Sequence, residues 1–97
     1  MATYIVLAHF TERGIMNVKN TTQRAEEFKL MAIRHGVTVS RIFWTLGQYD
    51  VVIMVDAPDE MTMTALSMSL GSLGNVRTQT LRAFSEAEMQ TILHKMA

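Results

Sequence analysis

Four stretches of the chain carry the apolar patterns that are typical of β-strands, over residues 3–10, 37–46, 51–56 and 76–84. The first stretch alternates, yet it is apolar on both faces, which indicates a strand covered on both sides. Its two faces are Tyr4, Val6, Ala8 and Phe10 on one side, and Ile5, Leu7 and His9 on the other. The third stretch is a continuous run of β-branched residues and Met, as expected of a central buried strand.

The second stretch alternates strictly, which predicts that its two faces carry different side chains. We expect Val39, Arg41 and Phe43 on one face, and Ser40, Ile42 and Trp44 on the other. The segment Gly47-Gln48-Tyr49-Asp50 separates it from the third stretch and predicts a hairpin. Gly47 would supply the permissive backbone conformation that such a turn requires.

Apolar residues spaced by three and four predict three helices, over residues 21–35 and 60–70 and from Ser85 onward. We expect Asn20, Asp59 and Ser85 to cap them in that order, with Glu88 completing a capping box at the last. Gly36 would provide the left-handed residue after the first helix. Residues 11–20 are expected to form a polar loop.

The helices also have predicted inward faces. In the first helix this stripe is Ala25, Phe28, Met31, Ala32 and His35, widened by Leu30 and Ile33. In the second helix the apolar positions are Met61, Ala65, Leu66, Met68 and Leu70, and Met at helical spacing favours a core or an interface over a metal site.

The element order is therefore βαββαβ with a C-terminal helix, which predicts an α+β, ferredoxin-like domain over residues 1–97. Its two main helices should cover one face of a four-stranded antiparallel sheet. The other sheet face is also apolar, and only the short last helix is left to cover it. Two sheets packed face to face as a dimeric α+β barrel would bury it, with a ligand pocket between each sheet and its helices or loops.

Composition supports self-association and narrows the partners. Hydrophobic residues make up 48% of the chain and nine are Met, more than one small core needs. Nine basic and nine acidic residues cancel without a basic tract, which argues against nucleic acid and anionic membranes as partners. There is no Cys, no apolar run long enough for a membrane span and no signal-peptide pattern, so we expect a soluble, cytoplasmic protein.

Nearly the whole chain resembles the GYD domain family. The residues that carry the resemblance are Tyr4-Ile5-Val6-Leu7, Phe10-Thr11-Glu12-Arg13-Gly14, Arg24-Ala25-Glu26, Trp44 to Val52, Ala57-Pro58-Asp59 and Leu73 to Phe84. The triplet that names the family corresponds to Gly47, Tyr49 and Asp50, with Gln48 between the first two. The resemblance implies a ferredoxin-like domain of the dimeric α+β barrel type. Broader relatives of that architecture include cofactor-independent monooxygenases, haem-dependent enzymes and ligand-sensing domains, and fold alone does not choose among them.

Five residues are candidates for a ligand site, namely His9, Trp44, Tyr49, Asp50 and Arg77. His9 is in phase with aliphatic residues, so it either makes a structural hydrogen bond or acts as an acid or base in a lined cavity. Tyr49 and Asp50 either tie the strands together or form a polar pair at a pocket mouth. Trp44 is interpreted as packing in the core or an interface.

Arg77 needs a carboxylate or an anionic ligand in an apolar sheet, and Asp50, Asp56 and Asp59 are its candidate ion-pair partners. Arg24 either pairs with a neighbouring Glu on its helix or reaches the preceding loop. His35 and His94 lie on helices without ligand-type spacing to His9, and no phosphate loop or nucleophile motif is present. We therefore expect neither a metal nor a cofactor.

Three classes of function stay open on the sequence. The first is a small homo-oligomeric domain that binds a small ligand or acts as a regulatory module. The second is a cofactor-independent oxygenase- or isomerase-like enzyme that uses His9 and Arg77, with Tyr49 or Asp50, in an apolar pocket. The third is a module whose only role is assembly.

Overall fold

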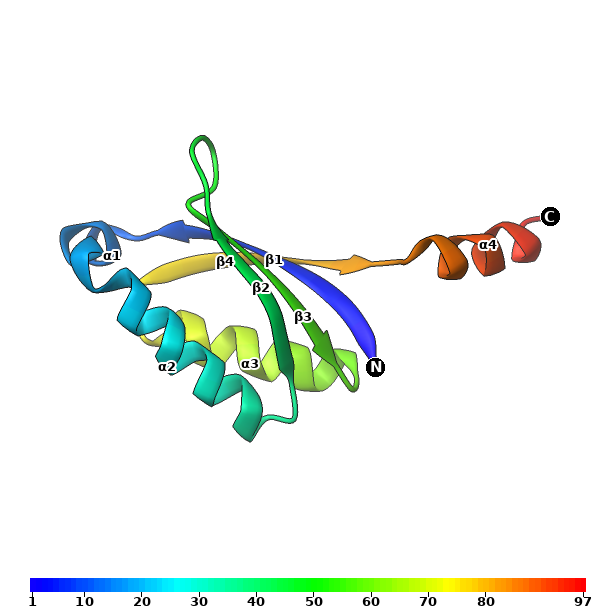
Figure 1. Cartoon of the computed structure of the whole chain (residues 1–97), viewed down its shortest axis with the longest axis horizontal. Coiled ribbons are helices and arrows are strands. Elements are labelled where there is room, and N and C mark those ends of the chain that lie inside the picture. The colour runs from blue at the N-terminus through cyan, green and yellow to red at the C-terminus, as the bar shows by residue number, and fades with distance from the viewer.

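The computed structural model describes all residues from Met1 to Ala97. Its elements, in chain order, are β1 (Ala2–Phe10), α1 (Glu12–Met16), a 3-10 turn η1 (Val18–Asn20), α2 (Thr21–Arg34), β2 (Thr38–Trp44), β3 (Val51–Ala57), α3 (Glu60–Ser72), β4 (Val76–Ala83) and α4 (Glu86–Lys95). The strands form one antiparallel sheet in the order β2-β3-β1-β4. Figure 1 shows α2 and α3 together on one side of this sheet. The α+β, ferredoxin-like arrangement of the sheet and helices agrees with the sequence prediction.

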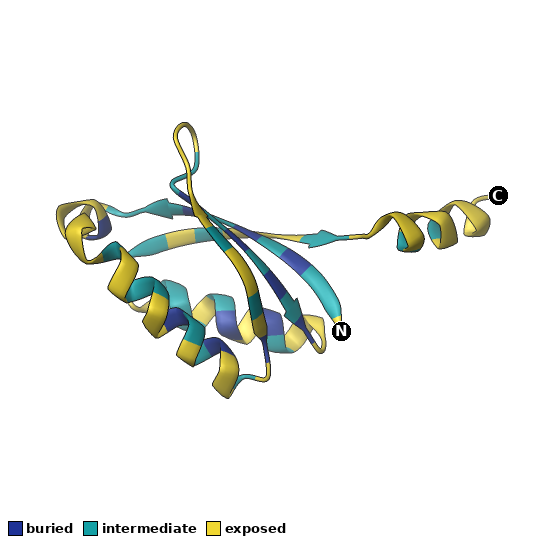
Figure 2. Ribbon diagram, viewed as in Figure 1, coloured by how far each residue is buried: buried dark blue, intermediate teal, exposed yellow.

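The hydrophobic core lies between the sheet and the pair α2 and α3 (Figure 2). Its twelve buried residues are Tyr4, Val6, Ala8, Phe28, Ala32, Val37, Val51, Ile53, Val55, Ala57, Met63 and Leu66. The strand members alternate along β1 and β3, which confirms the predicted phase of β1 and divides the continuous apolar run of β3 between the two faces. Every second residue of these strands consequently points to the opposite side, away from both helices.

That opposite side is the open face of the sheet, which no helix of the chain covers (Figure 1). Cross-strand neighbours share a face, so the register identifies its members. They are Arg41 and Phe43 on β2, Val52, Met54 and Asp56 on β3, Thr3, Ile5, Leu7 and His9 on β1, and Arg77, Gln79 and Leu81 on β4. The centre of the open face is aliphatic and the charged residues lie toward its borders.

The strict alternation predicted for β2 is wrong, because a β-bulge interrupts it. Val39 pairs with Val55 and Arg41 with Met54, so Ser40 is the extra residue of the bulged strand. The bulge places Val39, Ile42 and Trp44 on the helix side, while Arg41 and Phe43 occupy the open face.

Three details of the helices also differ from the prediction. Residues 11–20 form α1 and η1 instead of a loop, and Asn20 makes no side-chain cap because η1 runs directly into α2. Leu30 and Ile33 do not widen the inward stripe of α2, since both are exposed on its outer side. In α3 the buried methionine is Met63, whereas Met61 and Met68 are exposed.

The other predicted helix ends are confirmed. Asp59 accepts a hydrogen bond from the backbone N–H of Thr62 at 2.7 Å, and this bond lowers the pKa of the Asp59 carboxyl. At α4 the Ser85 hydroxyl accepts from Glu88 N, and the Glu88 carboxylate accepts from Ser85 N. The latter bond, together with Arg82, lowers the pKa of Glu88. Gly36 follows the C-cap residue of α2 and adopts the left-handed conformation, with φ of 72°.

Gly14 in α1 lies against the turn that precedes β4. Thr11 N donates to Asn75 O at 3.0 Å and the Thr11 hydroxyl donates to Gly74 O at 2.6 Å, which draws α1 onto this turn. A Cβ atom built on Gly14 would lie 2.0 Å from Asn75 O, a backbone atom that cannot move independently. Only glycine therefore allows this approach.

We predict that Gly14→Ala lowers the free energy of unfolding by about 1–3 kcal/mol, because the new methyl group forces α1 and the Gly74-Asn75 turn apart. Gly71→Ala is the matched control, since no atom lies within 4 Å of its Cβ position and α3 gains a better helix former. Urea unfolding followed by circular dichroism measures both. Equal stability of the two variants would contradict the close contact.

Candidate functional site

Three of the predicted site residues meet at one end of the open face. His9, near the end of β1, lies beside Tyr49 with ring centroids 4.7 Å apart and an interplanar angle of 41°. Tyr49 reaches across β1, and its hydroxyl donates to Oε1 of Gln79 on β4 at 3.1 Å. Arg77 stands directly opposite His9 in the register of β1 and β4. These residues form the polar cluster of the open face: His9, Tyr49, Arg77 and Gln79.

The predicted ion pair of Arg77 is absent. The salt bridges of the chain are Lys29 with Glu26 and Arg82 with Glu88. The three carboxylates proposed as partners of Arg77 have other donors: Asp50 binds Phe10 N, Asp56 binds the Thr3 hydroxyl and Asp59 binds Thr62 N. Arg77 is exposed, so water solvates its guanidinium and no internal carboxylate is required.

Asp50 fastens the loop between β2 and β3 to the end of β1. Its carboxylate accepts from Phe10 N at 2.8 Å, and its own N–H donates to Ala8 O at 2.9 Å. Within the loop, Thr45 N donates to Asp50 O, and Gly47 adopts φ of 120°. These bonds hold the backbone next to Tyr49, and thereby place the Tyr49 ring over β1.

Trp44 lies on the other side of the sheet, at the mouth of an apolar pocket between the sheet and the helices. Its Nε1 donates to the Thr21 hydroxyl at the start of α2 at 2.9 Å. Arg24 borders the same pocket, and its guanidinium donates to Asn17 O and Gly14 O. It therefore reaches the segment before its helix, as one sequence interpretation held, and that segment is α1 and its C-cap. The apolar lining includes Phe10, Phe28, Met31, Ile42, Leu70 and Val76.

The size of this pocket limits what it can hold. Its volume is about 80 Å³. Pockets for drug-sized ligands measure about 300–1,000 Å³, and an engineered dry cavity that binds benzene measures about 150 Å³. The pocket accommodates one small apolar group, such as a side chain or the end of a ligand, and not a whole metabolite.

The polar cluster and the apolar pocket lie on opposite faces of the sheet. His9 and Arg77 occupy the open face, whereas Trp44 and the pocket lie on the helix side. An apolar pocket that contains His9 and Arg77 is therefore not formed within the chain. No group of three His, Asp or Glu side chains is arranged to hold a metal ion. None of the helices is both long and apolar enough to cross a membrane.

Sequence reasoning missed two hydrogen-bond partners at these sites, Gln79 and Thr21. Gln79 follows Arg77 by two residues, so strand alternation already put both on one face. The bond from Trp44 to Thr21 joins a strand to a helix. Alternation places Trp44 on the face of Ile42, but it does not predict which face of the strand meets the helices.

Comparison with known proteins relates these features to a family. The sequence profile of the GYD domain matches residues 4–93. The chain is also 34% identical over 90 residues to a protein of Thermus thermophilus, the glutamine synthetase and cystathionine beta-lyase binding protein. This alignment covers 92% of the present chain and 95% of the relative.

We predict that Asp50→Ala lowers the free energy of unfolding by about 1–2 kcal/mol, because the part-buried N–H of Phe10 loses its charged acceptor. Asp50→Asn keeps an acceptor oxygen and should retain part of that stability. Gln48→Ala, in the same exposed loop, is the control and should stay within about 0.5 kcal/mol of the natural protein. Thermal unfolding measures all three, and an unchanged Asp50→Ala would contradict the anchoring role.

Proposed function

The chain belongs to the GYD domain family, and we propose that it acts as a self-associating binding module whose partners are other proteins. The observation that carries this proposal is the open face of the sheet, which is apolar at its centre and uncovered in the single chain. The relative that binds two enzymes supports the choice of proteins as partners. In this role the chain regulates or organises an enzyme and performs no chemistry of its own.

Self-association follows from the cost of leaving the open face in water. Each apolar Å² removed from water contributes about 25 cal/mol, and the face presents aliphatic side chains on its two central strands. They are Ile5 and Leu7 on β1 and Val52 and Met54 on β3, with Leu81 and Phe43 beside them on the edge strands. A second sheet packed about 10 Å away across a two-fold axis covers them in both copies, which gives a dimeric α+β barrel.

Protein partners suit the remaining surface better than a metabolite does. The apolar pocket beside Trp44 has a volume of about 80 Å³, which is too small for an enclosed ligand of ordinary size, and the larger hollow of about 470 Å³ between α3 and β4 is shallow and open to solvent. The chain has a net charge of zero, so it has no general electrostatic attraction to nucleic acid. We place its activity in the cytoplasm, with metabolic enzymes of the kind named for the relative.

A small ligand is a second candidate, favoured by the same pocket. An apolar group entering beside Trp44 would contact Phe28, Met31 and Ile42, while Arg24 and Glu27 border the opening. Such a ligand would tune the packing of α2 on the sheet. The enzyme alternative has less support, because His9 and Arg77 do not share this pocket.

We expect Met54→Lys to convert the protein from an oligomer to a folded monomer. The substitution puts a cation at the centre of the open face, next to Arg41 on the neighbouring strand. Ile33→Lys is the matched control, because it changes an exposed apolar residue on the outer side of α2. Sedimentation velocity at micromolar concentration measures the mass of the particle, which is compared with 11.0 kDa for one chain. A monomeric natural protein, or a Met54→Lys variant of unchanged mass, would refute self-association through this face.

We expect the purified chain to bind the glutamine synthetase or the cystathionine beta-lyase encoded by the same organism. Biolayer interferometry with each immobilised enzyme should give saturable binding, and an unrelated enzyme of similar size should give none. Absence of saturation at about 100 µM would exclude any complex more stable than about 5.5 kcal/mol and would remove the support that the relative gives.

A further inference from the structure

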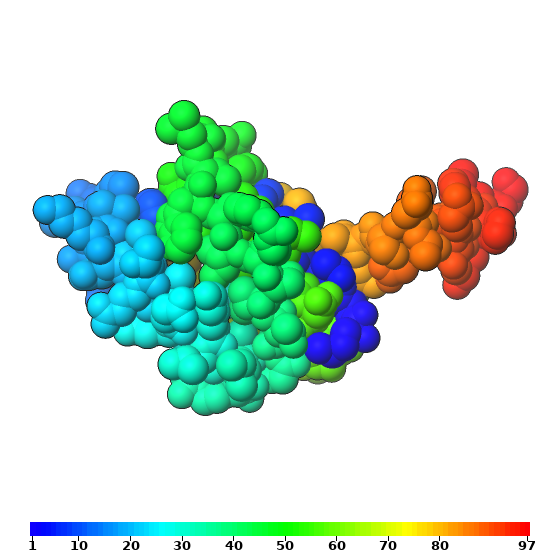
Figure 3. Space-filling view, in the orientation of Figure 1, coloured from blue at the N-terminus to red at the C-terminus, as the bar shows by residue number.

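The C-terminal helix α4 has no packing partner within its own chain. Figures 1 and 3 show it extending away from the body beyond the end of β4. The molecule is consequently elongated, with extents of 50 × 30 × 18 Å. Its radius of gyration is 14.5 Å, whereas a compact domain of this length measures about 12.5 Å.

The helix is nevertheless built to pack against something. Met89, Ile92 and Leu93 are spaced by three and four residues and form one apolar stripe, and Met96 follows directly after the helix in an extended conformation. In the isolated chain 44% of Met89, 46% of Leu93 and 68% of Met96 is exposed. Helices shorter than about 12–15 residues are marginal in water, so α4 depends on a surface that covers this stripe.

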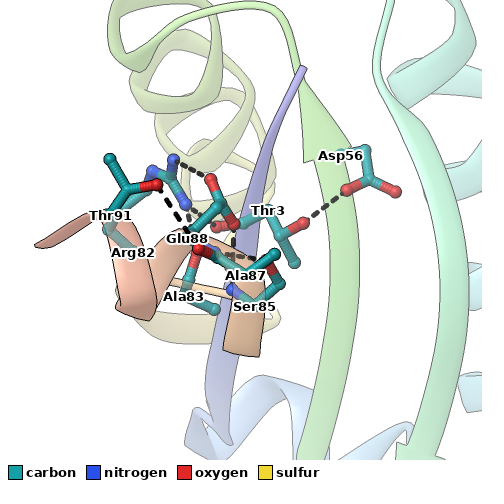
Figure 4. A network of polar contacts seen from close by, with 8 residues as sticks. All are labelled: Thr3, Asp56, Arg82, Ala83, Ser85, Ala87, Glu88 and Thr91. Carbon is teal, nitrogen blue, oxygen red and sulfur yellow. Dashed lines mark hydrogen bonds and ion pairs between the residues drawn. The ribbon is translucent and has the colours of Figure 1, made fainter.

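The helix cannot fold back onto its own sheet without breaking the junction that precedes it. Only Phe84 and Ser85 separate β4 from α4, and the capping box fixes the first turn. Arg82 joins this turn to the sheet, as Figure 4 shows. Its guanidinium binds the Glu88 carboxylate at 3.3 Å, the Thr3 carbonyl at 3.3 Å and the Ala83 carbonyl.

The same guanidinium also lies 4.4 Å above the Phe84 ring. Its ion pair with Glu88 is partly exposed and weak by itself, with side-chain exposures of 29% and 42%. The ion pair, the two carbonyls and the ring nevertheless act on one planar group from several directions. Together they orient α4 away from the body, so the surface that covers it belongs to another molecule.

We propose that α4 is an arm that packs its apolar stripe on a second copy of this chain, along the border of the open face beside the contact between the two sheets. This inference rests on the self-association proposed above and adds the segment that completes it. The chain has two uncovered apolar surfaces, the open face and the stripe of α4. A two-fold axis lets the centres of the two open faces cover each other, while each arm packs at the border of its partner's face.

Charges at the start of α4 and at two borders of the open face are opposite in sign, although Asp56 also lies on that face and Lys95 lies in the last turn of α4. Arg41 and Arg77 lie on the open face, and neither has a carboxylate within salt-bridge distance. Glu86 in the first turn of α4 likewise has no cation within that distance. An arm that runs along the border of a second copy's open face brings Glu86 near Arg41 or Arg77 on an edge strand, where the opposite charges favour the pairing of like chains.

The first test replaces the stripe while keeping the whole chain and the helix. The double variant Met89→Gln with Leu93→Gln retains good helix formers and removes apolar contact area. We expect the dissociation constant of the dimer to rise at least about 100-fold. Ala87→Gln with Thr91→Gln, on the opposite side of α4, is the control and should leave the constant unchanged.

The second test locates the arm. The chain has no Cys, so Met96→Cys provides a single thiol for benzophenone maleimide. Irradiation should give covalent dimers whose cross-links map from α4 to an edge strand of the sheet, β2 or β4, of the other copy. Cross-links within one chain, cross-links between two copies of α4, or none at all would overturn the inference.

The outcomes separate this inference from the proposed function. A monomeric natural protein removes both. A dimer that Met54→Lys dissociates, but that the Met89→Gln and Leu93→Gln variant leaves at full strength, overturns the arm alone and keeps association through the sheet.

Discussion

The sheet of this protein has two apolar faces, and the chain supplies helices for only one of them. Because β1 and β3 are central and apolar on both sides, each contributes alternate residues to the core under α2 and α3 and to the open face. Burial of the residues that face α2 and α3 stabilises the fold of the single chain. Exposure of the residues on the open face is unfavourable by about 25 cal/mol for each apolar Å² in water, which links the architecture to an assembly.

The loops at the end of β1 depend on this sheet for their positions. Asp50 binds the backbone of Phe10, and Thr11 binds the backbone of Gly74 and Asn75. Two connections that are distant in sequence are thus fixed to the same end of one strand, and Gly14 allows their closest approach. Within the polar cluster, the contacts of Tyr49 with His9 and Gln79 are a consequence of that anchoring, because the loop holds the Tyr49 ring across β1.

The sequence pattern predicted the order of the four strands and the three longer helices, the phase of β1 and two of the three helix caps, because local hydrogen bonds and side-chain alternation determine these features. It failed at Ser40, where the bulge inserts one residue without altering the apolar pattern and moves Val39 to the face of Ile42 and Trp44. It also failed at Asn20, because η1 leads directly into α2 and leaves no cap to make. For the site, phase placed His9 with Ile5 and Leu7, but only the folded register sets Arg77 opposite His9.

The course of α4 shows a different limit of single-chain reasoning. Its capping box and its apolar stripe agree with each other, since both specify the same helix from neighbouring residues. The isolated chain offers nothing to pack against that stripe, although foldable sequences generally satisfy local and tertiary preferences together. The open face likewise has no packing partner in the single chain, although its side chains are as apolar as those of a strand face that is buried. The apolar stripe of α4 and the open face are thus two uncovered apolar surfaces in one small chain. Both are buried if the unit that folds is an assembly of two chains, and the arm and the open face are then parts of one core.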